Sequence, residues 1–300
     1  MKKRRCFLLM AFCLIFLGQG RLSYAQNPQT IEVGPHFGAS SYIGELNVWR
    51  NLGQWQWKEF NQFHYDWGLL ARYNYDSRWS FRIDYTHGKV RACDPEAAWR
   101  PDALLTFQST VNDLSLMVEF NFLDYYTGHV SNVISPYIFG GVSGFMFKTT
   151  PFTKDAQVDA ISLQPEQTEG IDYSKYSMSI PFGLGCKLSL SKHLATTVEW
   201  RMHYTFTDYL DDVSGLYPAD DKHVLLVSDA QGNMSVINGK PTNPGVGNTL
   251  VYDFTDPSGQ FSAKQQRGNT QTNDWFGFIN LSLTWKFVIP NRSSCKMNIE

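Results

Sequence analysis

The feature that most constrains the fold of this chain is a series of segments in which apolar and polar side chains alternate from one residue to the next. In one of them, Glu199 and Arg201 flank Trp200, and the alternation continues on both sides. A period of two predicts a β-strand with one apolar and one polar face. The first segment is the least regular, because Pro35 and Gly38 predict a break in it. Eight segments have this character: residues 31–43, 66–76, 79–89, 114–122, 137–147, 177–190, 197–206 and 279–287.

Residues 1–25 have the layout of a secretory signal peptide. A basic start, Lys2 to Arg5, precedes an apolar stretch that ends in a small-x-small site at Ala25. We expect cleavage after Ala25; the alternative is an uncleaved anchor, although the stretch is shorter than the roughly 20 residues of a spanning helix. The segment holds five of the 26 basic residues and no acid, so 21 basic and 28 acidic residues remain, a net charge of −7. Such an acidic chain is not expected to bind nucleic acid.

The lengths of the connections between the segments indicate how the strands are arranged. Long connections, at about 43–66, 90–112, 148–176 and 208–274, alternate strictly with short ones. Outer-membrane barrels have short periplasmic turns and long outer loops. The sequence therefore predicts an all-β fold, an eight-stranded antiparallel transmembrane β-barrel over residues 26–287, in the outer membrane and in contact with its lipid. Both termini and a tail, residues 288–300, are then periplasmic; a soluble β-sandwich is the alternative.

The two faces of the predicted strands differ in chemistry. The apolar face is rich in aromatic residues and is expected to contact lipid, because aromatic rings concentrate at membrane interfaces. On the segment 137–147, Tyr137, Phe139, Phe145 and Phe147 share one face, with glycines between them. An eight-stranded barrel is narrow enough for side chains to fill it. We therefore expect the polar face to form an interior network of ion pairs and hydrogen bonds; in a soluble sheet it would be a solvated face. The expected members are Arg72, Arg82, Asp84, Glu119, Lys187, Glu199, Arg201, His203 and Lys286.

A search for reactive groups identifies two places. Asp208, Asp211 and Asp212 could hold Ca²⁺ through oxygen ligands, but their spacing is not that of an EF-hand, and a solvated turn is expected. His203 could partner Glu199, Arg201 or a serine such as Ser115, and is expected to be an interior residue rather than a base. The other histidines, including His36, are assigned to turns and loops. No catalytic residue, cofactor site or metal site is predicted.

Two further features concern the exported chain. It keeps three widely spaced cysteines, which are expected to be free thiols because they have neither disulfide nor zinc spacing: Cys93, Cys186 and Cys295. Residues 228–272 are rich in glycine and small polar residues, which predicts a long mobile outer loop or a small hairpin extension.

Several stretches resemble a known family of outer-membrane barrels. They are residues 33–47, 72–75, 79–82, 135–142 and, most specifically, 205–217. The central motif of the last stretch consists of Phe206, Thr207, Asp208, Tyr209, Leu210, Asp211, Asp212, Val213, Ser214 and Gly215. Together these stretches resemble the PorG-like barrels associated with the type IX secretion system.

The resemblance implies a non-enzymatic component of the secretion machinery. Such a barrel anchors a periplasmic ring of PorK- and PorN-like subunits to the outer membrane, and no catalytic residue is carried over from the motif. The turn 124–135 and the tail 288–300 are the expected contact surfaces. Two alternatives remain open: a small outer-membrane enzyme acting on lipid or peptide, and a structural or adhesion barrel without a secretion role.

Overall fold

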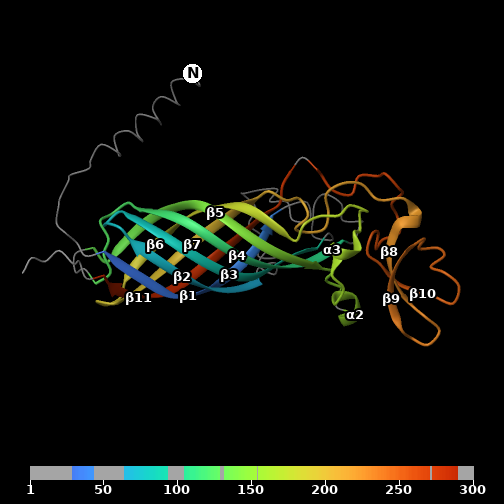
Figure 1. Cartoon of the computed structure of the whole chain (residues 1–300), viewed down its shortest axis with the longest axis horizontal. Helices are drawn as coiled ribbons and strands as arrows, with labels where there is room; N and C mark the ends of the chain where they lie inside the picture. Colours follow the sequence, from blue (N-terminus) through green and yellow to red (C-terminus); the bar gives the residue numbers. More distant parts are fainter. Residues whose placement is uncertain are drawn as a thin grey trace, which may run out of the picture.

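The fold is an antiparallel β-barrel closed by eight strands, seen in a computed structural model (Figure 1). The structure describes residues 29–43, 64–93, 105–128, 132–153, 155–270 and 272–289. The expected signal peptide, nearly all of the tail 288–300 and Cys295 lie outside these residues, as does the side chain of Cys93. Cys186 is a free, exposed thiol.

The barrel strands follow one another around the wall in sequence order, and the last pairs with the first. Around the barrel the order is β1-β11-β7-β6-β5-β4-β3-β2. This confirms the predicted all-β, eight-stranded antiparallel barrel. The strands are β1 (Thr30–Ile43), β2 (His64–Asn74), β3 (Trp79–Cys93), β4 (Thr106–Asn121), β5 (Ile134–Thr150), β6 (Tyr176–Ser189), β7 (Leu194–Thr205) and β11 (Trp275–Val288).

Strand β1 is continuous, so the predicted break at Pro35 and Gly38 is wrong. Pro35 faces outward and pairs with Leu69 of β2, while the pairing of β1 with β11 skips Gly34 and Pro35. Proline has no N–H to donate, so the pairing of β1 with β11 is interrupted locally, whereas the pairing of β1 with β2 continues. Glycine is needed at position 34, because an added Cβ would lie 1.9 Å from the carbonyl oxygen of Leu283.

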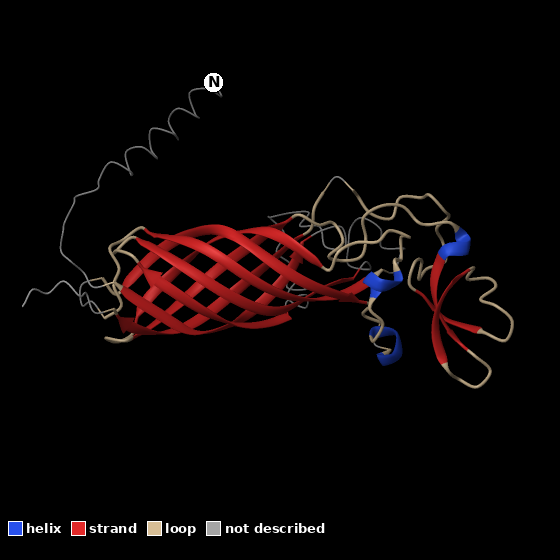
Figure 2. Ribbon diagram, in the orientation of Figure 1, coloured by secondary structure: helices blue, strands red, loops and turns tan. Residues whose placement is uncertain are grey.

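The strand ends joined by short connections and the strand ends joined by long connections lie at opposite ends of the barrel (Figure 2). Three short turns, β2–β3, β4–β5 and β6–β7, share one end with the start of β1 and the end of β11. We call this the turn end. The long connections β1–β2, β3–β4, β5–β6 and β7–β11 all emerge at the other end, which we call the loop end.

Part of the polypeptide at the loop end forms a small folded unit, the loop-end module. Three strands in the order β10-β8-β9 form its sheet: β8 (His223–Ser228), β9 (Met234–Gly239) and β10 (Thr249–Asp253). The helices α2 (Ala156–Asp159) and α3 (Leu163–Glu166) and the 3-10 turn η3 (Asp220–Lys222) lie nearby (Figure 1). Its core comprises Val158, Leu163, Val224, Leu226 and Phe254. Residues 228–272 therefore include an ordered β extension.

The outward face of the barrel is apolar. Leu116 and Leu281 are 53% and 57% exposed, as expected only if lipid covers them. Outward aromatic residues lie near both ends of the strands, which is the girdle arrangement of transmembrane barrels. Towards the turn end these are Tyr75, Trp79, Phe122, Trp285 and Phe287; towards the loop end, Tyr65, Trp67, Tyr85 and Tyr176. Among the residues described, no helix is long and apolar enough to span a membrane.

The prediction that four aromatic residues of β5 share one face is confirmed, and this face lines the lumen. Tyr137, Phe139, Phe145 and Phe147 point into the barrel, where each is at most 6% exposed. Both faces of this strand are apolar or glycine-rich, so the alternation does not distinguish them. The inward face is decided by β6, whose glycines leave room for large rings: an added Cβ at Gly185 would lie 2.7 Å from the ring of Tyr137.

A charge on the outward face should destabilise the barrel according to its depth in the membrane. The substitution Leu116→Arg places a guanidinium in hydrocarbon and should lower the free energy of unfolding by about 2–4 kcal/mol. The measurement is urea unfolding of the barrel in lipid vesicles. The control Gln231→Arg lies in an exposed turn between β8 and β9, outside the barrel wall, and should change stability little. Equal effects of both substitutions would contradict the assignment of the lipid face.

Candidate functional site

The barrel lumen holds most of the residues that the sequence assigned to an interior network. They come from five different strands, and their side chains are at most 4% exposed. Only Lys286, near the turn end, is half-buried; its Nζ donates to the carbonyl oxygen of Thr127. The structure thus places the following inside the barrel: Arg72, Arg82, Asp84, Glu119, Lys187, Glu199, Arg201 and His203.

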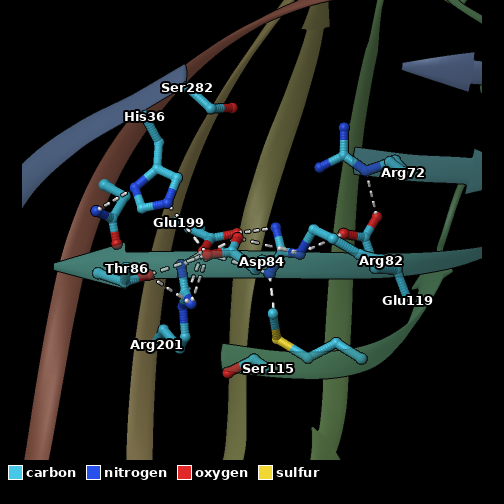
Figure 3. A network of polar contacts seen from close by, with 12 residues as sticks. His36, Arg72, Arg82, Asp84, Thr86, Ser115, Glu119, Glu199, Arg201 and Ser282 are labelled. Carbon is cyan, nitrogen blue, oxygen red and sulfur yellow. Dashed lines mark hydrogen bonds and ion pairs between the residues drawn. The ribbon is translucent and has the colours of Figure 1, made fainter. Parts of the chain in front are cut away.

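The centre of the network joins opposite walls of the lumen, and Figure 3 shows its members. Arg82 of β3 donates to Glu199 of β7 at 2.6 Å, and Arg201 of β7 donates to Asp84 of β3 at 3.2 Å. Strands β3 and β7 stand opposite each other in the closed order of strands. Guanidinium and carboxylate groups from opposite walls therefore meet directly and occupy the lumen at this level.

Towards the turn end the network continues through alternating charges. Glu119 lies 2.8 Å from Arg72 Nε and 2.6 Å from Lys187 Nζ. Arg72 in turn donates to Glu32 at 2.9 Å, and Glu32 accepts a hydrogen bond from Thr127 at 2.5 Å. Thr127 belongs to the turn between β4 and β5, which therefore folds over the turn end and closes the lumen there.

Towards the loop end the network continues through a histidine that sequence reasoning misplaced. His36 lies on β1 and points into the lumen, rather than in a turn or loop. Its Nε2 is 3.1 Å from Asp84, and its Nδ1 is 3.1 Å from Asn280, which also bonds Asp66. Glu32, His36 and Ser40 occupy inward positions of β1 at intervals of four. This spacing is the signal in the sequence, and Pro35 hides it because a proline normally marks a break in a strand.

His203, which the sequence singled out as a possible base, lies near both a serine and an aspartate. The geometry of these three side chains is unsuitable for catalysis. Ser179 Oγ is 2.9 Å and Asp113 Oδ1 is 3.7 Å from the same ring nitrogen, Nδ1. A nucleophile and an orienting carboxylate must instead occupy opposite ring nitrogens. The ring stacks on Phe276 at 4.3 Å and is fully buried. Ser115 bonds Asp113, not His203.

The motif Phe206–Gly215 closes the loop end of the barrel. Leu210 and Val213 are at most 1% exposed and pack among the inward aromatic residues at the mouth of the barrel, including Phe147 and Phe276. The hydroxyl of Tyr42 donates to Asp211 at 2.6 Å. The backbone of Leu210 is also bonded on both sides, to Asp274 and Thr149. Residues 210–214 of the motif are thus part of the core and form a plug.

The expectation that Asp211 and Asp212 lie in a solvated turn is wrong, since they are 2% and 1% exposed. Asp212 accepts hydrogen bonds from Thr168 and, at 2.6 Å, from Tyr173, both in the β5–β6 connection. Arg267 donates to the carbonyl oxygen of Asp212 at 2.5 Å. The motif therefore ties the two long connections together. In the described part of the chain, no group of three or more His, Cys, Asp or Glu side chains could hold a metal ion.

A buried carboxylate completes this plug. Glu169 accepts hydrogen bonds from the amides of Ser214 and Gly215 at 2.9 and 2.8 Å, and it pairs with Arg267 at 3.1 Å. Burial raises the pKa of Asp212 to about 6, opposed by the Arg267 guanidinium and by the hydrogen bonds to the carboxylate. The plug therefore favours a protonated Asp212 in mildly acidic solution.

Removing one central cation should destabilise the barrel strongly. Arg82→Met leaves Glu199 and Glu119 buried with fewer partners, and loss of one partner of a buried ion pair costs about 3–5 kcal/mol. Urea unfolding in lipid vesicles measures the loss. The control Arg78→Met breaks an ion pair with Asp124 whose side chains are 45% and 58% exposed, and should cost at most about 1 kcal/mol. Similar losses in the two variants would contradict the network.

The plug should become more stable as the pH falls. The pKa of Asp212 is raised from 3.8 to about 6, so the folded plug binds more protons than the unfolded chain between these values. The free energy of opening should therefore rise as the pH falls from 7 to 4, by an amount on the order of 2–3 kcal/mol. Hydrogen exchange of the Val213, Ser214 and Gly215 amides, corrected for intrinsic rates, measures it. Asp212→Asn should abolish this dependence, and an unchanged dependence in that variant would refute the assignment.

Comparison with solved structures finds outer-membrane proteins of low sequence identity. Neisserial surface protein A is 10% identical, with 86% of this chain and 97% of that chain covered and a TM-score of 0.40. The outer membrane protein OprG from Pseudomonas aeruginosa is 14% identical, with 87% and 97% covered and a TM-score of 0.39. These likenesses are too weak to carry an argument about function. A comparison with curated proteins finds no match.

A comparison with protein families does place the chain. The family described as "Domain of unknown function (DUF6089)" matches residues 6–256, which is most of the sequence and includes the motif Phe206–Gly215. The chain therefore belongs to the DUF6089 family.

Proposed function

We propose that this protein is a non-enzymatic β-barrel of the outer membrane that anchors other components to the membrane. The observation that carries the proposal is the pair of ion-pair contacts between opposite walls, Arg82 with Glu199 and Arg201 with Asp84. They occupy the lumen, and the reactive side chains there are already bonded to one another. A filled lumen supports a rigid anchor better than a pore or an enzyme.

We further propose that the anchored component is the periplasmic ring of the type IX secretion machinery, with PorK- and PorN-like subunits. This rests on the resemblance of residues 205–217 to PorG-like barrels. Because residues 210–214 are buried in the loop-end plug, this part of the motif marks the barrel type in our proposal and is not itself the ring contact. In this proposal the turn end, which holds the start of β1 and the end of β11, faces the periplasm and therefore the ring.

The described residues exposed at the turn end are candidates for this contact. Arg78 and Asp124 form an exposed ion pair beside the β2–β3 and β4–β5 turns. Lys192 and His193 are exposed in the β6–β7 turn. The predicted turn surface 124–135 is thus only partly available, because Thr127 is directed into the lumen. The tail 288–300, the other predicted contact, lies almost wholly outside the described residues.

Affinity purification from native membranes tests the secretion role. The wild-type barrel should recover ring subunits. Arg78→Glu combined with His193→Glu should reduce their recovery at least about fivefold at equal barrel levels. The first substitution reverses a charge in the proposed contact and the second adds a negative charge there. The control Lys240→Glu lies in the loop-end module and should leave recovery unchanged. Absence of ring subunits from the wild-type sample would refute the secretion role.

A second candidate function is attachment to a surface through the loop-end module. The observation that favours it is that the module has its own apolar core and carries exposed apolar residues at a loop tip and on β10: Val246, Leu250 and Val251. Normal protein secretion by cells that lack the barrel, together with loss of surface attachment, would favour this candidate over the anchor.

A further inference from the structure

The outer surface of the barrel changes abruptly from apolar to basic on one side of the loop end. Strands β3, β4 and β5 have 15, 16 and 17 residues, more than the 9–11 that a spanning strand needs. Along the outward face of β5, Met146 is followed by Lys148. Along that of β3, Tyr85 and His87 are followed by Lys89. The strands therefore continue beyond the lipid, and lysines mark the point where they leave it.

Strand register brings these lysines together. Lys89 pairs with Thr110 of β4, and Thr110 pairs with Lys148 of β5. Two strand spacings separate Lys89 from Lys148, so their backbones lie about 10 Å apart. The carbonyl oxygen of Lys175 accepts a hydrogen bond from the Phe147 amide at 2.9 Å, which places Lys175 beside Lys148. We call Lys89, Lys148 and Lys175 the basic row.

The charge of the basic row is not neutralised by ion pairs with its neighbours. Within the described ranges, none of its three lysines forms a salt bridge, whereas the cations of the lumen are all paired. The carboxylate of Asp113, on the strand between them, points into the lumen. Arg91, next along β3, is already engaged: it donates to Gln108 at 2.6 Å and stacks on Phe152 at 3.9 Å.

We propose that the basic row binds the phosphate groups of an anionic lipid in the leaflet nearest the loop end. Lysines at a membrane surface attract anionic headgroups, and their long stems can lie along apolar surface while the ammonium reaches the interface. The proposal rests on the outer-membrane location proposed above, and does not require the secretion role.

The barrel surface between the basic row and the lipid-facing wall favours a lipid over a soluble anion as the ligand. Leu114, Met146 and Met178 are exposed and apolar, and they continue from the row into the lipid-facing wall. Acyl chains of the same molecule can cover this surface while its phosphates contact the lysines. The separation of about 10 Å between Lys89 and Lys148 suits a headgroup with more than one phosphate.

The test uses purified protein in neutral detergent, with native mass spectrometry as the readout. The probe is lipid A with two phosphates, compared with its monophosphorylated form and with inorganic phosphate. We expect lipid A to bind more tightly than the monophosphorylated form. Lys89→Gln with Lys148→Gln should weaken binding about 25-fold, since one lysine near an anionic lipid contributes about a factor of five.

The control is Lys240→Gln, an exposed lysine in the loop-end module outside the barrel wall, which should leave lipid binding unchanged. Equal affinities of the double variant and the wild type would overturn the proposal, as would displacement of lipid A by inorganic phosphate at similar concentration. Because no ring subunit is present, the outcome is independent of the secretion role. Separate membrane fractionation of cells tests the outer-membrane location.

Discussion

The constraint on which the rest of the structure depends is that a sheet in hydrocarbon must leave no edge unpaired. Lipid offers no partner to backbone N–H and C=O groups, so the first and last strands must meet. Here β1 pairs with β11 from Thr30↔Val288 to Ile43↔Trp275, and the gap beside Pro35 is the one interruption in that ladder. Closure with eight strands in turn makes the lumen narrow enough for opposite walls to touch.

Closure also explains why the interior is charged and yet stable. Arg82 contacts both Glu119 and Glu199, and Glu119 is shared with Arg72 and Lys187, so each charge in this central cluster has at least one partner of opposite sign. Isolated charges in such a place would be strongly unfavourable. The two ends are closed differently: polar groups of the β4–β5 turn close the turn end, while an apolar plug built around Leu210 and Val213 closes the loop end.

The sequence predicted the strands and their faces wherever polarity alternates cleanly, as on β3 and β7. It left the inward face of β5 undecided, because glycine and aromatic residues make both faces of that strand apolar. The inward face is chosen by the space above Gly183 and Gly185 on β6. It missed His36 for a different reason. A proline normally interrupts a strand, but at position 35 the missing donor costs only a local gap in the β1–β11 ladder.

The sequence by itself determined the barrel class, since a period of two, apolar outer positions and alternating connection lengths are all local properties. Only the tertiary structure decided which charges meet. Arg82 and Glu199 are 117 residues apart, and they bond because strand order and register bring β3 and β7 face to face. The burial of Asp211 and Asp212 was decided in the same way: their partners come from β1 and from another connection, and closure of the barrel brings these within reach.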